Sequence, residues 1–410
     1  MPSTPEASKD ELNENQENLS QASESTLSAV APDPNEEHNY FCDDTLPKNV
    51  MSPKTALNFA ASELDKMKSD HDVLFQENFK LKREIREAEK NRFSFDRIRH
   101  SNELVKMHTG LPSALMFDWL FEQLEPHLED LKYFKGKNSF NVEKYQTSGC
   151  LKPGPSRALK PVDELLITLM KLRMNLSHAD LAFRFKVSTS LIVSILSTWI
   201  TFLGIELKSL IRWPSTSNIF EYYPACYKAV KGLVLSIIDC TEVFTDNPSL
   251  AEANSKMYSS YKSHTTVKVL IAIGPSGCIS FLSQIAGGAM SDQQIVRKSN
   301  LLEKFLKTAS DTDQPLVILA DRGFNINDDL PDNVTIVYPP FKHGKSQFSP
   351  DETKSTKVVA HARIHVERVI GRVKEFRIFQ SPLPLDFIDL IDHIFTVCCA
   401  IVNLNPEVVK

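Results

Sequence analysis

Five short runs of aliphatic and β-branched residues lie between residues 232 and 340, and they restrict the possible folds more than any other feature of the chain. Each run is bounded by Gly, Pro or Asp, as strands are: "GLVLSIID", "TVKVLIAIGP", "CISFLSQIAGG", "PLVILADRGF" and "VTIVYPP". A helical stretch, "DQQIVRKSNLLEKFLK", separates the third run from the fourth, and two long helical segments follow at about 352–377 and 386–403. This order predicts an α/β domain at about 230–408, a mixed sheet flanked by helices.

Two of these runs end on an aspartate, Asp239 in the first and Asp321 in the fourth. Open α/β sheets build their sites where apolar strands end. If the two strands are neighbours, the carboxylates lie side by side and repel each other unless they are protonated or bridged by a cation. A divalent, oxygen-preferring metal such as Mg²⁺ is the natural bridge. Glu242, which follows Asp239 by three residues, lies beyond the predicted strand and is a weaker candidate.

A third ligand is available on the helix "STKVVAHARIHVERVIGRVKEFR". Glu367 lies about 100° round this helix from the apolar Val366, at the edge of the packing face. Arg363 and Lys374 share its side, and residues 354–377 hold seven Lys or Arg against two Glu, which suits a substrate that carries phosphate. The alternative interpretation is a solvated basic helix whose glutamate makes an i,i+4 ion pair.

Other chemistries find less support in the sequence. His361 and His365 are four residues apart and offer zinc ligands, but Ala362 stands where the H-E-x-x-H pattern needs Glu. The chain contains no G-x-S-x-G elbow, P-loop or G-x-G-x-x-G. The seven cysteines form no C-x-x-C pair, which argues against a structural zinc site and suits a reducing compartment, the cytosol or the nucleus.

The N-terminal part of the chain divides into an acidic tail and a heptad segment. Residues 1–48 hold eleven acids and two bases, so the rest of the chain carries about +4, and we expect residues 1–55 to be disordered. A coiled coil is predicted at 56–95, in which Asn78 would fix the register of a parallel dimer. A single amphipathic helix packed on its own domain is the alternative. The two core positions of the heptad hold Leu64, His71, Asn78 and Ile85, and Met67, Leu74, Leu81 and Ala88.

Residues 96–205 are predicted to be helical, with a helix-turn-helix at about 161–203. Ser113 and Ser188 are candidate N-caps. A short helix, a tight turn and a longer helix form the DNA-binding layout, although any small helical bundle shares it. Phosphate contact needs cations, which flank these helices at Lys152, Arg157, Lys160, Lys171, Arg173, Arg184 and Lys186. The apolar C-terminal stretch "FIDLIDHIFTVCCAIV" is too short and too charged to span a membrane and is expected to be a core helix.

Six segments of the chain together resemble the catalytic domain of Harbinger-type DDE transposases and of host proteins derived from them: "IIDCTEVF", "YKSHTTVKVLIAIGPSGCISFLSQIAGGAMSDQQI", "LADRGFNI", "YPPFKHGKSQFS", "ARIHVERVIGRVKEFRI" and "VCCAIVNLNP". The resemblance covers about 230–406, and residues 96–203 resemble the helical region that precedes this domain. It implies a ribonuclease-H-like fold in which Asp239, Asp321 and Glu367 match the DDE triad. Several relatives begin with a THAP zinc finger, for which this chain lacks the cysteines.

The resemblance also implies Mg²⁺- or Mn²⁺-dependent chemistry on DNA phosphodiesters in the nucleus. Two ions would act on an in-line displacement at phosphorus, with Asp239 bridging both and Asp321 and Glu367 each holding one. We expect Asp292 to be either a supporting acid near the metals or the N-cap of the next helix, with the cap favoured, and His365 to support the site. The alternative function is a non-catalytic nuclear DNA-binding or adaptor protein. Candidate phosphate contacts are Lys262, His264, Lys268, Arg363 and Lys374.

Overall fold

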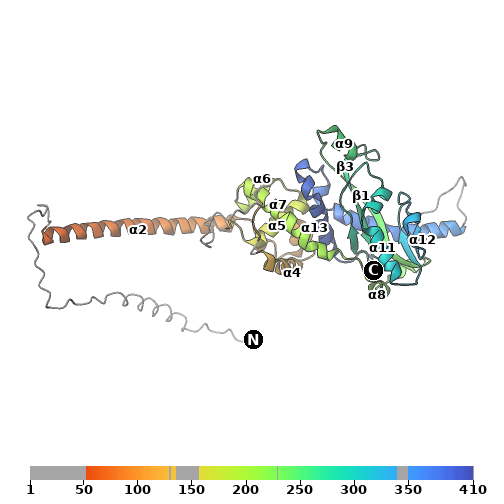
Figure 1. Cartoon of the computed structure of the whole chain (residues 1–410). Helices are drawn as coiled ribbons and strands as arrows, with labels where there is room; N and C mark the ends of the chain where they lie inside the picture. Colours follow the sequence, from red (N-terminus) through yellow and green to blue (C-terminus); the bar gives the residue numbers. More distant parts are fainter. Residues whose placement is uncertain (1–51, 129–130, 135–156, 229, 339–349, 410) are drawn as a thin grey trace, which may run out of the picture. The chain divides into compact units, whose positions relative to one another are not determined.

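The computed structural model describes residues 52–128, 131–134, 157–228, 230–338 and 350–409 (Figure 1). It consists of two units, residues 1–84 and 85–410, which are treated separately below. The predicted acidic tail falls almost entirely outside the described residues.

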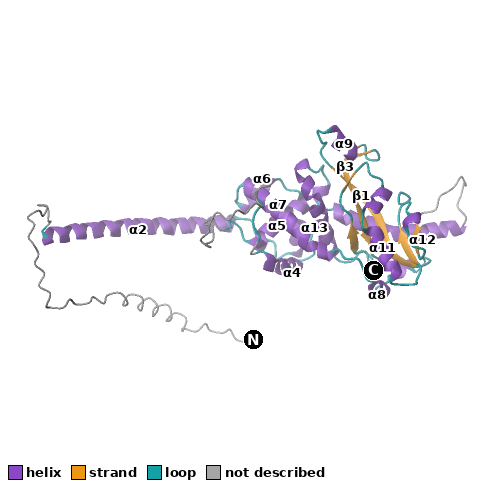
Figure 2. Ribbon diagram, in the orientation of Figure 1, coloured by secondary structure: helices purple, strands orange, loops and turns teal. Residues whose placement is uncertain are grey.

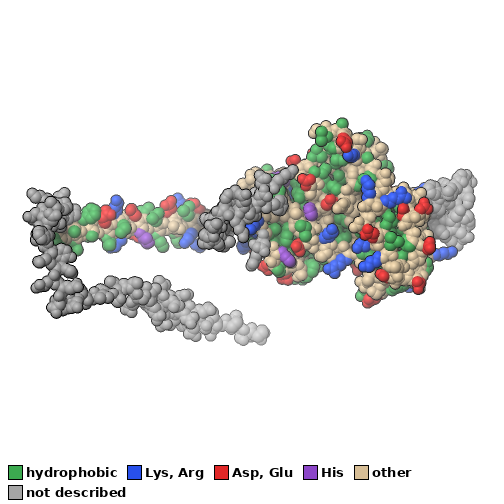
Figure 3. Space-filling model, in the orientation of Figure 1, with side chains coloured by type: hydrophobic (Ala, Val, Ile, Leu, Met, Phe, Trp, Pro, Cys, Tyr) green, Lys and Arg blue, Asp and Glu red, His purple; other side chains and the backbone are tan. Residues whose placement is uncertain are grey.

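The first unit contains most of one helix, α2 (Pro53–Asn91), which runs for 39 residues. Ser52 precedes it and its hydroxyl accepts a hydrogen bond from the Thr55 N–H at 3.3 Å. Apolar side chains lie exposed along the helix among charged ones, as Figure 3 shows; they include Leu57, Leu64, Met67, Leu74 and Leu81. The helix predicted over the heptads is therefore confirmed, whereas its pairing in a coiled coil stays a prediction.

The second unit begins with a group of helices (Figure 2). Ser113 caps α4 by accepting from the Met116 N–H, and Ser188 caps α7 by accepting from the Leu191 N–H, so both predicted N-caps are confirmed. The predicted helix-turn-helix corresponds to three successive helices. The elements are η2 (Phe95–Arg97), α3 (Asn102–Thr109), α4 (Ala114–Leu124), η3 (Glu125–His127), α5 (Pro161–Met174), α6 (His178–Phe185), α7 (Thr189–Glu206), η5 (Leu207–Leu210), α8 (Thr216–Glu221) and η6 (Ala225–Tyr227).

A buried carboxylate ties this group of helices together. Glu164 on α5 is fully buried, and its oxygens accept hydrogen bonds from the Tyr133 hydroxyl and, at 2.8 Å, from the Trp199 indole N–H of α7. The Arg157 guanidinium lies 3.4 Å from the same carboxylate. A charge can be buried only when partners replace its water, and here three side chains from separate segments do so.

A mixed sheet follows, in which β1 (Leu233–Phe244) is central. β3 (His264–Ile273) pairs with β1 antiparallel, and β4 (Ile279–Leu282) pairs with β3 antiparallel. β6 (Leu316–Leu319) lies parallel to the other side of β1, and β7 (Val334–Val337) lies parallel to β6. The short β2 (Tyr258–Ser259) and β5 (Ala286–Gly287) add to β3. Three antiparallel strands followed by two parallel ones form the curled mixed sheet that was expected from the sequence.

Helices cover both faces of this sheet (Figure 2). On one face lie α12 (Pro350–Lys374) and α13 (Ile391–Asn403), and their apolar side chains share a single core with α3, α5 and α7. On the other face lie α10 (Asp292–Lys298) and α11 (Leu301–Ser310). The helical group and the sheet are therefore built on one continuous core. The remaining elements are α9 (Ala251–Met257), η7 (Asn327–Asp329), η8 (Arg377–Phe379) and η9 (Leu385–Leu390).

The structure corrects the predicted extent of the first strand. β1 does not end at Asp239 but continues to Phe244, because β3 goes on pairing with it up to Phe244–Thr266 after β6 has ended. Glu242 therefore lies within the strand and not beyond it. The third predicted run divides into β4 and β5, and the predicted helix after it divides into α10 and α11.

We expect Glu164→Ala to lower the free energy of unfolding by about 3 kcal/mol, because it leaves the Trp199 N–H, the Tyr133 hydroxyl and the Arg157 charge without their acceptor. Urea denaturation followed by circular dichroism measures the change. The matched control is Asp118→Ala, which removes an exposed ion pair with Arg99 and should cost at most about 1 kcal/mol. Equal losses in the two variants would contradict the structural role of the buried carboxylate.

Candidate active site at the rim of the sheet

The pairing of β1 with β6 brings two aspartates together. The last paired residues of these parallel strands are Ile237 and Leu319. Asp239 and Asp321 each follow that pair by two residues, so the chain delivers both carboxylates to the same rim of the sheet. The negative charge of Asp321 contributes to raising the pKa of Asp239, which agrees with their closeness. The pairing register of β1 and β6 thus places the two aspartates side by side, as the two strand ends predicted.

Asp239 and Asp321 experience different surroundings. Burial is the main cause that raises the pKa of Asp239 to about 6, with smaller contributions from the charges of Asp321 and Asp292. The Arg363 guanidinium and a hydrogen bond from the Cys240 N–H, 2.8 Å long, act in the opposite direction. The Asp321 side chain is 56% exposed and accepts a hydrogen bond from the Arg322 N–H at 2.8 Å. The Asp239 carboxylate is therefore largely buried, whereas the Asp321 carboxylate faces solvent.

Helix α12 contributes to the site a cation and the third predicted acid. Asp239 lies opposite Ile271 on β3, and Ile271 belongs to the core that includes Val366 of α12. Because paired residues in an antiparallel ladder point to the same face, Asp239 points toward α12. The Arg363 guanidinium, only 12% exposed, lies 3.7 Å from the Asp321 carboxylate.

Glu367 follows Arg363 by four residues, so it lies on the same side of α12, one turn along. Its side chain is exposed. Among the residues that the structure describes, no three or more acids, histidines or cysteines gather closely enough to hold a metal ion. The structure therefore brings Asp239 and Asp321 together, whereas the place of Glu367 in the site stays a prediction.

A second group of charges lies on the opposite face of the sheet. Lys268 of β3 lies 3.3 Å from Glu242 and 3.2 Å from Asp292, and its ammonium also donates to the Met290 carbonyl at 3.1 Å. Lys268 thus has three partners within the protein, and its role as a phosphate contact stays a prediction. Sequence reasoning missed the Glu242–Lys268 pair, although the antiparallel register of β1 and β3 places the two residues directly opposite each other.

Asp292 is not the N-cap of α10. Ser291 caps that helix, in a capping box with Gln294, and Asp292 is the first helical residue. Its carboxylate approaches Gly323, where a Cβ would lie 2.8 Å from the Asp292 Oδ2 atom. Asp292 therefore packs against the loop that carries Asp321, and its charge contributes to raising the pKa of Asp239. The favoured N-cap interpretation was wrong.

The remaining candidate residues lie in different surroundings. Lys374 stays in contact with solvent, while burial and the charge of Lys262 lower its pKa and the charges of Asp239 and Glu242 raise it, so Lys374 lies near these acids and Lys262 lies near Lys374. His264 packs its ring edge-on against Phe244. His365 is instead buried beside Tyr227 and Cys226, in the packing between α12 and the segment before β1. The His361 side chain lies outside the described residues.

Most cations predicted to flank the helix-turn-helix have partners inside the protein. Arg184 pairs with Asp180 at 2.7 Å and Arg173 with Glu375 at 3.1 Å. Lys171 is buried and donates to the Asn175 side chain and the Leu176 carbonyl. Lys152 lies outside the described residues. Among the described members of the set, Lys160 and Lys186 are the exposed lysines, and Lys186 lies 4.1 Å over the Phe183 ring.

Comparison with known proteins identifies the part of the chain that carries these acids. Residues 238–403 match the family described as DDE superfamily endonuclease. The chain contains a DDE superfamily endonuclease domain. Residues 157–209 match the helix-turn-helix of DDE superfamily endonuclease, which covers α5, α6 and α7. No curated protein and no solved structure matches the chain.

One segment of the helix-turn-helix is apolar enough to cross a membrane by length and composition alone. It spans Thr189–Leu210, in the part of the chain that the structure describes, and half of its most apolar window is buried inside the fold. Its inward residues, such as Trp199 and Ile195, belong to the core shared with the DDE domain. The hydrophobicity of α7 is therefore accounted for by packing.

The raised pKa of Asp239 predicts a pH dependence of stability in metal-free protein. A carboxyl whose pKa is higher in the folded state than in the unfolded chain favours folding when protonated, and this contribution is lost as the pH rises through the folded pKa. The free energy of unfolding of the wild type, relative to Asp239→Asn, should therefore fall between about pH 4 and pH 6, by on the order of 2 kcal/mol. Urea denaturation in EDTA at a series of pH values measures this difference, and a flat profile would contradict the burial of Asp239.

Proposed function

We propose that the DDE domain cleaves or transfers DNA strands in a reaction that depends on a divalent metal, with Asp239, Asp321 and Glu367 as its catalytic acids. The β1–β6 register carries the proposal, because it delivers two carboxylates to one rim of a domain that belongs to the DDE endonucleases. A partly buried aspartate beside an exposed one is a donor set of hard oxygens, the kind that Mg²⁺ and Mn²⁺ prefer. Glu367, one turn from Arg363, is the third donor.

When bound, divalent ions would lower the pKa of a water or a DNA 3′-hydroxyl and stabilise the leaving oxygen. The contribution of the chain itself is to position charge. Asp239 and Asp321 repel each other, and Arg363 lies close enough to both to offset their charge. A guanidinium in that position can also donate two parallel hydrogen bonds to a phosphate. Lys262 and Lys374 extend the positive charge along the same edge and are the further phosphate contacts of the proposal.

DNA is accordingly the partner that we propose, and the nucleus the compartment. The helix-turn-helix supports DNA binding at the level of its family. Because most of its candidate cations form ion pairs or hydrogen bonds within the protein, we assign much of the phosphate contact to the cations on α12. Binding should weaken as salt is raised, since neutralised phosphates release counterions.

A second function remains in competition, a non-catalytic DNA-binding or adaptor protein that keeps the fold. The observation in its favour is that, within the described parts of the chain, no group of three acids, histidines or cysteines is assembled to hold a metal. The two functions differ in whether removal of Asp239 changes what happens to DNA.

We expect full-length protein with Mg²⁺ or Mn²⁺ to nick supercoiled plasmid, and Asp239→Asn and Asp321→Asn to reduce nicking by about 100-fold or more, since a lost metal ligand removes several kcal/mol of transition-state stabilisation. Asp332→Asn is the matched control, because this exposed aspartate precedes β7 at the opposite end of the parallel strands. Agarose gels resolve nicked from supercoiled plasmid. Equal nicking by wild type and Asp239→Asn would favour the adaptor.

We also propose that α2 pairs with α2 of a second copy as a parallel coiled coil. With the heptad register that places Leu64 and Asn78 at the a position, Glu63 and Glu77 occupy g positions, and Lys68 and Lys82 occupy the e positions five residues later. In a parallel pair each of these glutamates faces a lysine of the other helix. Complementary charge thus adds to the exposed apolar stripe as support for a second copy as the partner.

Charge reversal tests this pairing. Lys68→Glu combined with Lys82→Glu places like charges across the interface, and should convert the protein to a monomer or raise the dimer dissociation constant by about tenfold or more, at a few tenths of a kcal/mol per pair. Adding Glu63→Lys and Glu77→Lys restores opposite charges and should restore the dimer. Light scattering after gel filtration reports the mass. A wild type that stays monomeric at micromolar concentration would contradict the proposal.

A further inference from the structure

The chain between β1 and β3, residues 245–263, forms a projection beyond the sheet that carries α9 and β2 (top of Figure 1). It is fixed in place by close packing on a pair of glycines. A Cβ on Gly287 would lie 2.2 Å from the Lys256 carbonyl oxygen, and one on Gly288 would lie 2.8 Å from that of Met257. The Thr265 hydroxyl oxygen, on β3, also lies within hydrogen-bond distance of the Thr245 carbonyl and of the Asn247 side chain, at 2.9 and 2.6 Å. These contacts hold the projection in a defined position on the domain.

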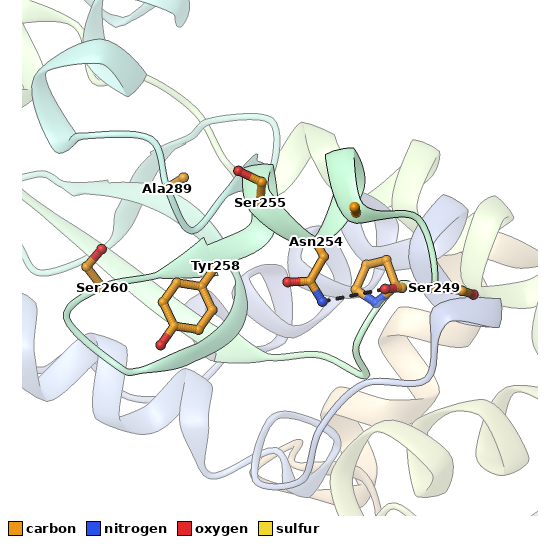
Figure 4. Close-up of a pocket in the computed structure, with 8 residues that line it drawn as sticks. Ser249, Asn254, Ser255, Tyr258, Ser260 and Ala289 are labelled. Carbon is orange, nitrogen blue, oxygen red and sulfur yellow. Dashed lines mark hydrogen bonds between the residues drawn. The ribbon is translucent and has the colours of Figure 1, made fainter.

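A cleft of about 640 Å³ opens along this projection. Tyr258 contributes an aromatic side chain, and Asn254, Ser255 and Ser260 contribute an amide and hydroxyls (Figure 4). The Asn254 amide donates a long hydrogen bond of 3.5 Å to the Pro248 carbonyl, which leaves its oxygen turned to the cleft side as an acceptor. None of the side chains that line the cleft carries a charge. The chemistry fits a neutral, planar, hydrogen-bonding group better than a phosphate.

Exposed aromatic rings lie beside this cleft. Tyr261 is 83% exposed, more than any other aromatic ring in the part of the chain that the structure describes, and Tyr258 is 44% exposed. The Lys262 ammonium lies 4.6 Å from the centre of the Tyr261 ring. An exposed ring with a cation against it is the combination that binds unpaired nucleic acid, since bases stack on the ring and the cation faces the backbone.

We propose that the projection binds an unpaired DNA base. The base stacks on Tyr261, and a neighbouring base edge meets Tyr258, Asn254 and the serine hydroxyls in the cleft. The substrate class is then DNA with an unpaired or splayed end. The choice of DNA rests on the function proposed above, whereas the binding of an unpaired base can be tested without any cleavage.

The test compares fluorescently labelled blunt duplex with the same duplex bearing a short single-stranded tail, by anisotropy with full-length protein in EDTA. Wild type should bind the tailed DNA more tightly. Tyr261→Ala should weaken tailed binding by about 5- to 150-fold, the range for loss of one base stack, and leave blunt binding unchanged. Tyr261→Phe keeps the ring and should bind as the wild type does. Tyr222→Ala, which removes another well-exposed ring at the end of α8, is the matched control.

A second measurement uses a fluorescent adenine analogue in the single-stranded tail. Its emission should change on binding to wild type and Tyr261→Phe, and not on binding to Tyr261→Ala. Equal affinity of wild type for tailed and blunt DNA, or unchanged tailed binding by Tyr261→Ala, overturns the proposal. A protein that prefers tailed DNA but never nicks plasmid keeps this inference and loses the proposed nuclease, so the two failures are distinguishable.

Discussion

The parallel pairing of β1 with β6 is the constraint on which the rest of the site depends. The register of this ladder shifts once, between Val234 and Ser236, and after that shift a slip of one residue would turn the following side chains to the other face. Here the ladder stops at Ile237 and Leu319, and the next residues but one are the two aspartates. The burial of β1 between two layers of helices holds that register. The placement of the carboxylates is thus decided by apolar residues that take no part in the chemistry.

Charge at the rim is balanced on both faces of the sheet. Arg363 forms an ion pair with Asp321 on the face that α12 covers, and Lys268 forms ion pairs with Glu242 and Asp292 on the face that α10 covers. These pairs reduce the repulsion that four acids near one strand would otherwise produce. Because α12 also packs into the core shared with α5 and α7, the cation at the acids is anchored to the helix-turn-helix through continuous packing. The helix-turn-helix and the rim are in this way parts of one packed unit.

Sequence reasoning could predict the elements that strong local patterns encode. Aliphatic runs bounded by Gly, Pro or Asp were enough for the strands, and Ser113 and Ser188 for two helix starts. Asp239 and Asp321 were accessible because each follows such a run. The length of β1 was not, because its last residues pair with β3 after β6 has ended, and the polar Glu242 and Thr241 do not look like a buried strand. The same long-range pairing is what places Lys268 opposite Glu242.

The unexpected length of β1 has a consequence for where the projection begins relative to the acids. From Asp239 to Phe244 the strand advances five residues, about 17 Å at 3.4 Å per residue. The β1–β3 ribbon therefore extends the sheet by about 17 Å beyond Asp239 and ends where the projection begins.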